Sequence, residues 1–118
     1  MSKTKPNNFH IGVNGEEIAS NLLKQLGYRI IKQRYLTKLG EIDIVATKGS
    51  MISFVEVKTR ISHEQCLFAL SKRQQYRIYH AGEYFLQQYP DYIGYDVSLD
   101  LIGINHQGKA IHFANAWH

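Results

Sequence analysis

The sequence predicts an α/β fold in which helices and strands follow the order α-β-β-β-α-β-β. Apolar residues recur at helical spacing in two segments, and runs rich in β-branched residues lie between and after them. The 118 residues suit one hydrophobic core, so we expect a single domain at residues 9–118. Residues 1–8 are polar and contain Pro6, and we expect them to form a mobile tail.

The first predicted helix covers about residues 11–26. Gly27 is placed to end this helix in the left-handed conformation, and a strand is expected to start at Tyr28. A helix therefore leads directly into the sheet. The apolar stripe of the helix consists of Ile18, Leu22, Leu23 and Leu26.

Two runs rich in β-branched residues, at residues 41–46 and 51–58, predict a hairpin. Gly49-Ser50 is its expected two-residue loop, because a type II′ turn prefers Gly at its first position. In this register Lys48 pairs with Met51, and every residue farther along one run faces a defined partner on the other.

The predicted register brings two acids and a base together. Asp43 faces Glu56 across the hairpin, and Lys58 projects from the same face as Glu56 because side chains alternate along a strand. Two carboxylates in that relation repel each other, and a divalent cation between them would relieve the repulsion. The alternative is a solvated outer face on which Glu41 pairs with Lys58, and spacing alone leaves both interpretations open.

A second helix is predicted at residues 71–88, before two more strands. Ser71 and Gln74 have the spacing of a capping box, and Pro90 ends the helix. The strands are expected near residues 95–104 and 109–115.

Six short motifs occur in a fixed order along the chain. They are Gly12-x-x-Gly15-Glu16-x-x-Ala19, Gly27-Tyr28, Gly40-Glu41-Ile42-Asp43, Phe54-Val55-Glu56-Val57-Lys58-Thr59-Arg60, Asp96-x-x-x-Asp100 and Asn115-Ala116-Trp117. This ordered set resembles the YraN-like family of small bacterial proteins over nearly the whole chain. Two positions depart from the family pattern: Arg34 stands where an Asn is usual, and Ser98-Leu99 stands where Arg-Phe is usual.

The resemblance implies a restriction-endonuclease-like fold with a three-layer core around a central mixed sheet. Proteins of this PD-(D/E)XK superfamily, including the similar archaeal Holliday-junction resolvases, bind metal through an acid and a Glu-x-Lys motif. The implied cofactor is Mg²⁺, with Mn²⁺ as a substitute, and the implied ligands are Asp43, Glu56 and the backbone carbonyl of Val57. The implied catalytic residues are Asp43, Glu56, Lys58 and, as an auxiliary acid, Glu16. An acid in the first turns of a helix is also favoured by the helix dipole, which is the alternative explanation of Glu16.

The predicted function is divalent-metal-dependent hydrolysis of phosphodiester bonds in DNA, including branched or damaged DNA. The formal net charge of +4 favours a polyanionic partner. Two alternatives stay open: a nucleic-acid-binding or assembly module that keeps the nuclease fold without turnover, and an interaction protein with a surface ion-pair network. The residues expected to contact nucleic acid are Arg34, Lys38, Arg60, Lys72, Arg73 and Arg77.

The sequence contains no apolar run that would form a signal peptide or a membrane span, and its single cysteine, Cys66, allows no internal disulfide. We therefore expect a cytoplasmic protein without a membrane partner. The six histidines lack the paired spacing of a zinc site. Homodimer formation stays open, as does the role of Asp100, which is either a support for the site or a surface carboxylate.

Overall fold

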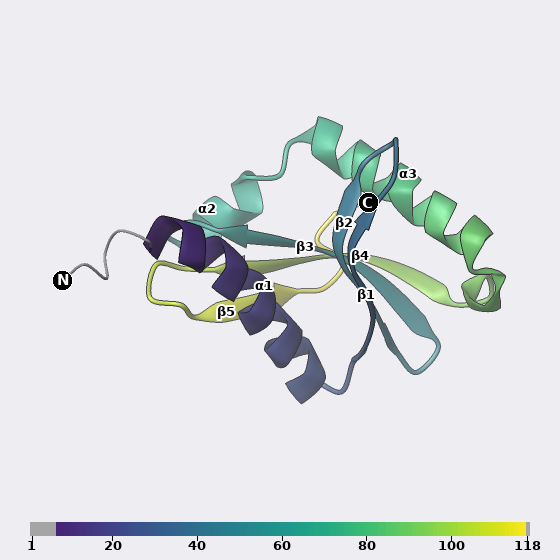
Figure 1. Ribbon diagram of the computed structural model, residues 1–118, viewed down its shortest axis with the longest axis horizontal. Helices are drawn as coiled ribbons and strands as arrows, with labels where there is room; N and C mark the ends of the chain where they lie inside the picture. Colours follow the sequence, from purple (N-terminus) through teal and green to yellow (C-terminus); the bar gives the residue numbers. More distant parts are fainter. Residues whose placement is uncertain (1–6, 118) are drawn as a thin grey trace.

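A five-stranded mixed sheet forms the centre of the structure, a computed structural model that describes residues 7–117 (Figure 1). The strands stand in the order β1-β2-β3-β4-β5. β3 and β4 run parallel, and the other neighbouring pairs run antiparallel. The predicted α/β class with a mixed sheet is therefore confirmed. The strands are β1 Arg29–Leu36, β2 Glu41–Lys48, β3 Met51–Thr59, β4 Asp96–Ile104 and β5 Ala110–Phe113.

Within residues 7–117 the helices are α1 Asn7–Gln25, α2 His63–Phe68, α3 Lys72–Gln88 and the short 3₁₀ helix η2 Pro90–Tyr92. α1 begins at Asn7 rather than near Ile11, and the rest of the predicted tail, residues 1–6, lies outside the described residues. The sequence did not indicate α2 and η2, because segments of one or two turns are too short to display helical periodicity. No helix in this part of the chain is long and apolar enough to cross a membrane.

The helices cover the two faces of the sheet and so complete three layers (Figure 1). α1 packs on one face through Leu23, which shares a buried cluster with Ile44. α3 packs on the other face, where the rings of Phe85 and Phe54 lie with their centroids 5.9 Å apart. Cys66 brings α2 onto the same face as α3.

The hairpin of β2 and β3 has the predicted register. Lys48 pairs with Met51, and Ile44 pairs with Val55. Gly49 has a φ of +60°, the left-handed value that the first position of a type II′ turn requires. The turn therefore fixes which residues of the two strands meet.

The predicted ends of the two long helices are also confirmed. Gly27, just beyond α1, has a φ of +95°. Ser71 and Gln74 form a complete capping box at the start of α3, in which the Ser71 hydroxyl accepts from the Gln74 backbone. Local sequence signals therefore determine where α1 stops and where α3 starts.

The alternation of side chains along β2 is broken at Asp43. Ile42 packs in the cluster under α3, whereas Ile44 packs in the cluster under α1, although residues two apart on a regular strand share one face. Backbone pairing of β2 with β3 ends at Ile44 and Val55. The two strands separate beyond this point, and we call this place the fork.

Candidate active site

Asp43 occupies the fork between β2 and β3. Its Oδ2 accepts a hydrogen bond of 2.8 Å from the backbone N–H of Val57. In a continued antiparallel ladder Val57 would bond to the backbone of Ile42, so the Asp43 carboxylate replaces one rung of the ladder. Because the N–H and C=O of one strand residue point to the same side, the Val57 carbonyl also faces the fork.

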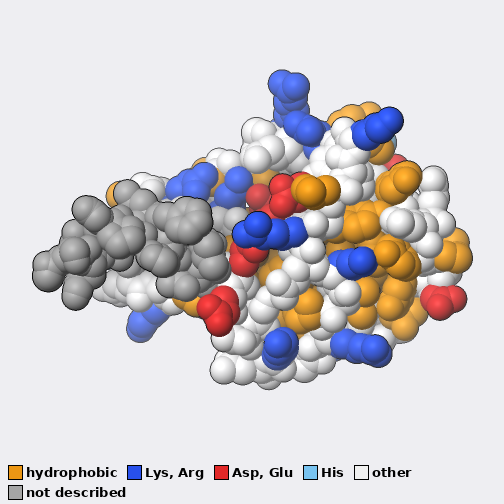
Figure 2. All heavy atoms as spheres, viewed as in Figure 1, with side chains coloured by type: hydrophobic (Ala, Val, Ile, Leu, Met, Phe, Trp, Pro, Cys, Tyr) orange, Lys and Arg blue, Asp and Glu red, His pale blue; other side chains and the backbone are white. Residues whose placement is uncertain are grey.

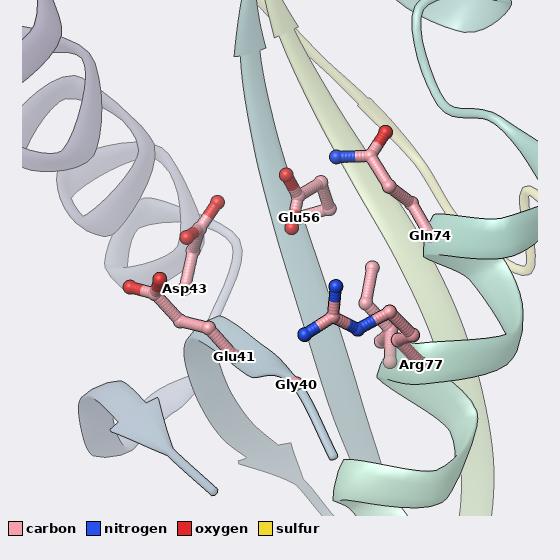
Figure 3. Close-up of a pocket in the computed structure, with 7 residues that line it drawn as sticks. Gly40, Glu41, Asp43, Glu56, Gln74 and Arg77 are labelled. Carbon is pink, nitrogen blue, oxygen red and sulfur yellow. The ribbon is translucent and has the colours of Figure 1, made fainter. Parts of the chain in front are cut away.

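A pocket of about 220 Å³ lies at the fork (Figure 3). Asp43 and Glu56 both line it, as the hairpin register predicts. Figure 3 shows Glu56 on β3, between the acids of β2 on one side and the side chains of α3 on the other. The lining residues are Gly40, Glu41, Asp43, Glu56, Gln74, Arg77 and Ile78.

The pKa values of the two central carboxyls are raised. Burial raises the pKa of Glu56 to about 8, and the charge of Asp43 adds to the rise. Burial likewise raises the pKa of Asp43 to about 6; the Val57 N–H opposes this rise, while the charge of Glu16 increases it. The two groups interact directly and therefore titrate as a pair. At neutral pH the pair retains a proton that a bound cation would displace.

Lys58 lies on the same face of β3 as Glu56. Its Nζ is 3.4 Å from Glu56 Oε2, and each of the two side chains is only 13% exposed. The Lys58 charge partly opposes the rise in the pKa of Glu56 that burial and Asp43 cause. The alternative of a solvated pair between Lys58 and Glu41 does not hold, because Lys58 pairs with Glu56 in a largely buried position.

The oxygen atoms at the fork suit a hard divalent cation. Two carboxylates and the Val57 carbonyl are ligands of the kind that Mg²⁺ and Mn²⁺ prefer. In the part of the chain that the structure describes, no three His, Cys, Asp or Glu side chains gather closely enough to hold a metal by themselves. Mg²⁺ does not require such a group, because it keeps several waters and takes phosphate oxygens from a substrate. The residues at the fork therefore fit this ion.

An ion pair between Arg34 of β1 and Glu16 of α1 lies beside the fork. Arg34 Nε donates a hydrogen bond of 2.9 Å to Glu16 Oε1. Glu16 raises the pKa of Arg34, and Glu41 and Asp43 contribute to the same rise. α1 starts at Asn7 and has no acid in its first turn, so the helix dipole does not explain Glu16.

Arg34 has a left-handed backbone conformation, with a φ of +54°. Asn adopts this conformation more readily than Arg does. The backbone thus gives a physical reason for the Asn that the family pattern places here, and the departure puts a guanidinium next to the acids of the site.

The profile of uncharacterised protein family UPF0102 matches residues 15–104, which include the fork and its acids. The chain belongs to this family. A UPF0102 protein of Rhodopseudomonas palustris is 42% identical over 92 residues, which cover 78% of this chain and 70% of that protein. A UPF0102 protein of Parvibaculum lavamentivorans is 35% identical over 109 residues, which cover 92% of this chain and 82% of that protein. The family resemblance predicted from the ordered motifs is confirmed.

Among solved structures, that of Pyrococcus furiosus SfsA in complex with Ca²⁺ is similar to this chain with a TM-score of 0.31 and 14% identity. The similarity covers 90% of the UPF0102 chain and 62% of the SfsA chain. It is too low to support any statement about function.

The basic residues predicted to contact nucleic acid lie on several surfaces of the UPF0102 chain. Arg77 lines the pocket, and its Nε donates to the Leu39 carbonyl at 2.9 Å. Arg60 is exposed beyond the end of β3, where its guanidinium bonds to the Thr59 carbonyl at 2.8 Å. Only Arg77 and Arg34 therefore adjoin the fork among these six. Exposed and outside the pocket lining are Lys38, Lys72 and Arg73.

Two polar side chains of the pocket, those of Glu41 and Gln74, are not indicated as site residues by the sequence. Glu41 has the same strand parity as Asp43 in the Gly40-Glu41-Ile42-Asp43 motif, and this parity could have placed it in the site. Gln74 is indicated only as a helix cap, yet its side chain also lines the pocket. Sequence spacing does not distinguish a capping Gln from one that also faces a site.

Asp100 belongs to a separate buried network. Its carboxylate lies 2.8 Å from His112 Nε2, accepts from the Asn115 backbone N–H at 2.9 Å, and accepts from the Ser98 hydroxyl. Burial acts to raise the pKa of Asp100, but hydrogen bonds from His112, Ser98 and Asn115 outweigh it and lower the pKa. The interpretation as a surface carboxylate is wrong, since Asp100 is fully buried. Asp100 does not line the pocket; it ties β5 and the following segment to β4.

Gly40 allows the start of β2 to lie against the backbone of α3. A Cβ at this position would come within 2.9 Å of the Arg77 carbonyl oxygen, and backbone would have to move. We expect Gly40→Ala to lower the free energy of unfolding by about 1–3 kcal/mol. The control is Gly94→Ala, because a Cβ at Gly94 would have nothing within 4 Å. Chemical denaturation of both variants tests this, and equal stability would contradict the tight contact.

Proposed function

We propose that this chain is a divalent-metal-dependent endonuclease that hydrolyses phosphodiester bonds in DNA. One observation carries the proposal: Asp43 and Glu56 share the pocket at the fork, and the pKa of each carboxyl is raised. Such a pair is unfavourable unless a proton or a cation lies between the two groups. Acids with strongly raised pKa values in a cleft are candidates for a functional site.

Asp43, Glu56 and the Val57 carbonyl are the groups that would hold the metal. When bound, Mg²⁺ would supply a water of lowered pKa and would polarise the phosphate. Asp43 is kept in place by its bond to the Val57 N–H, and Glu56 by its contact with Lys58. The two strands of the fork thus present the ligands from both sides.

Lys58 would stabilise the charge that develops on the phosphoryl group and would orient the attacking water. Its ammonium is held by Glu56 and largely shielded from solvent, so its interaction with an anion is stronger than at an open surface. On the opposite wall Arg77 uses Nε to bind the Leu39 carbonyl, and its other guanidinium N–H groups remain to bind phosphate oxygens.

The charges around the site suit both a cation and a polyanion. Figure 2 shows acidic side chains near the middle of one face of the molecule, with Lys and Arg side chains around them. The acidic side chains would attract the metal, and the surrounding Lys and Arg side chains would attract the phosphate backbone of the DNA. Arg34 would balance part of the negative charge through its ion pair with Glu16.

A cleavage assay tests the proposal. Purified protein would be incubated with duplex, single-stranded and four-way DNA in Mg²⁺ or Mn²⁺, beside the variants Asp43→Asn and Asp91→Asn. Asp91 is an exposed acid of η2 and serves as the matched control. Cleavage by wild type and Asp91→Asn, but not by Asp43→Asn, would support the proposal. A wild-type protein that cleaves none of these substrates would overturn it in favour of a binding or assembly module.

Nucleic acid should bind with an affinity that falls steeply as the salt concentration rises. The reason is that Lys and Arg side chains on α3 and beside the fork would displace counterions from the phosphates. Arg77→Ala should reduce the slope of log affinity against log salt by about one. Fluorescence anisotropy of a labelled oligonucleotide in EDTA at several salt concentrations measures both effects. Binding that does not depend on salt would contradict the expected phosphate contacts.

A further inference from the structure

The outer face of α3 carries exposed aromatic and basic side chains. Tyr76 is 66% exposed and Tyr79 is 46% exposed. Lys72 and Arg73, in the first turn of the helix, are exposed as well. The segment 72–82 contains no acid. This combination of basic side chains and exposed aromatic rings complements a ligand that carries both phosphates and planar nucleobases.

Helical geometry connects this face with the candidate active site. Arg77 lines the pocket on one side of α3. On the other side of the helix, Lys72, Tyr76 and Tyr79 line a separate groove of about 460 Å³. An α-helix with its side chains is about 10–12 Å wide, a span of about three nucleotides at the spacing of a stacked strand. A strand bound at the fork can therefore pass over Arg77 and reach both tyrosines.

The two rings are braced from within the helix. The ring of His80 lies 4.2 Å from that of Tyr76 and 5.4 Å from that of Tyr79, edge to face in both cases. His80 Nδ1 in turn lies 3.0 Å from Glu83 Oε1. Rings that are held in place but remain exposed lose little conformational entropy when a base stacks on them.

We propose that α3 binds a single-stranded segment of the substrate, with bases stacked on Tyr76 and Tyr79 and phosphates bound by Lys72 and Arg73. Bases in a duplex are covered by their neighbours, and only unpaired bases can offer their faces to these rings. The proposal rests on the proposed nuclease function and narrows its substrate class to DNA with an unpaired segment next to the scissile bond.

Binding of a labelled oligothymidylate in EDTA tests this proposal without requiring cleavage. Tyr76→Ala and Tyr79→Ala should each raise the dissociation constant about 5- to 100-fold, the range that the loss of one stacked base gives. Tyr76→Phe should bind like wild type because it keeps the ring, and Tyr76→Leu should behave like the Ala variant. Tyr84→Ala is the matched control: Tyr84 is 48% exposed on the same helix but lines a different pocket.

Ligand controls separate stacking from charge. An abasic strand of equal length should bind wild type and Tyr76→Ala equally, and so should a blunt duplex. Equal weakening by Tyr84→Ala, an unchanged affinity of the Tyr76 and Tyr79 variants, or a tyrosine effect that persists on the abasic strand would each overturn the proposal. Thermal unfolding of every variant should show that the fold is retained, because these side chains are exposed and their loss removes little packing. If the tyrosine variants bind like wild type while wild type cleaves duplex DNA, the nuclease proposal stands. If the tyrosine variants bind weakly but wild type cleaves no DNA, the nuclease proposal and the substrate assignment fall, and the single-strand binding site on α3 remains.

Discussion

Asp43→Asn should lose tight metal binding and DNA cleavage together. The substitution neutralises one of the two carboxylates at the fork and so removes a ligand and half of the charge that would hold Mg²⁺. The Asn side chain keeps a carbonyl oxygen that can accept the hydrogen bond from the Val57 N–H, so the fork should stay folded. Isothermal titration calorimetry measures the affinity for Mg²⁺, and the cleavage assay measures turnover.

Lys58→Ala should separate these two properties. Removing an ammonium near a divalent cation relieves like-charge repulsion, so metal should bind as tightly as in wild type or more tightly. Hydrolysis should fall by about 10²-fold or more, as for other groups that stabilise a transition state. Metal binding has to be measured above pH 8, because Lys58 lowers the pKa of Glu56, and its removal would increase competition from protons at neutral pH.

Lys109→Ala is the control for Lys58→Ala, since Lys109 is an exposed lysine next to β5, which β4 separates from the strands of the fork. A binding module without turnover predicts that wild type and Lys58→Ala are equally inactive, whereas an ion-pair network predicts no metal binding at all. If Asp43→Asn and Lys58→Ala both cut DNA as fast as wild type, the fork is not the active site.

The sequence predicts the hairpin because two local signals agree. Gly49-Ser50 fixes a two-residue turn, and the β-branched runs on either side fix the length of the strands. Once the register is known, Asp43 and Glu56 are expected at opposing positions of the two strands, and both of them line the pocket. The same holds for the start of α3, where Ser71 and Gln74 satisfy each other's backbone groups.

The fork itself could not be predicted from alternation. A regular strand would place Ile42 and Ile44 on one face, but the two side chains pack in different clusters, and the Val57 N–H bonds to the Asp43 side chain where a regular ladder would continue. A side chain that takes over a backbone rung leaves no periodic trace in the sequence.

Contacts between segments that lie far apart along the chain could not be predicted from the sequence either. The pairing of Arg34 with Glu16 depends on how α1 crosses β1, and the residues of α3 that reach the pocket depend on how that helix lies on the sheet. The sequence places Asp100 in a motif, but its partner His112 is brought close only by the pairing of β4 with β5.

Raising the pH should destabilise the metal-free protein. The pKa values of Asp43 and Glu56 in the folded state, about 6 and about 8, lie above the value of about 4 that applies to unfolded carboxyls. The folded state therefore holds protons more strongly than the unfolded state. The resulting stabilisation is complete below about pH 4 and is lost as the pH rises through 6 and 8. We expect the free energy of unfolding to fall by on the order of 2–4 kcal/mol as the pH rises from 4 to above 8, measured by urea denaturation in EDTA.

Glu56→Gln should remove the larger part of this pH dependence, because it removes the carboxyl whose pKa is raised most. The smaller rise in the pKa of Asp43, which burial and the charge of Glu16 cause, should remain. Above pH 8 the variant should be more stable than metal-free wild type, whereas Glu83→Gln, at an exposed position, should follow wild type. A wild-type stability that rises between pH 6 and pH 8 in EDTA would contradict the raised pKa values of the two carboxyls at the fork.

Mg²⁺ should restore the stability of wild type at alkaline pH but not that of Glu56→Gln. A ligand at 100 times its dissociation constant stabilises the folded state by about 2.7 kcal/mol, provided that it does not bind the unfolded chain. Protons and metal compete for the same oxygen atoms, so the apparent affinity for Mg²⁺ should increase as the pH rises through the titration of the pair. A buried pair of acids without a metal-binding role would bind no metal and would show the pH dependence alone. A stabilisation by Mg²⁺ that disappears in Glu56→Gln would therefore identify the fork as a metal site, even before any cleavage is detected.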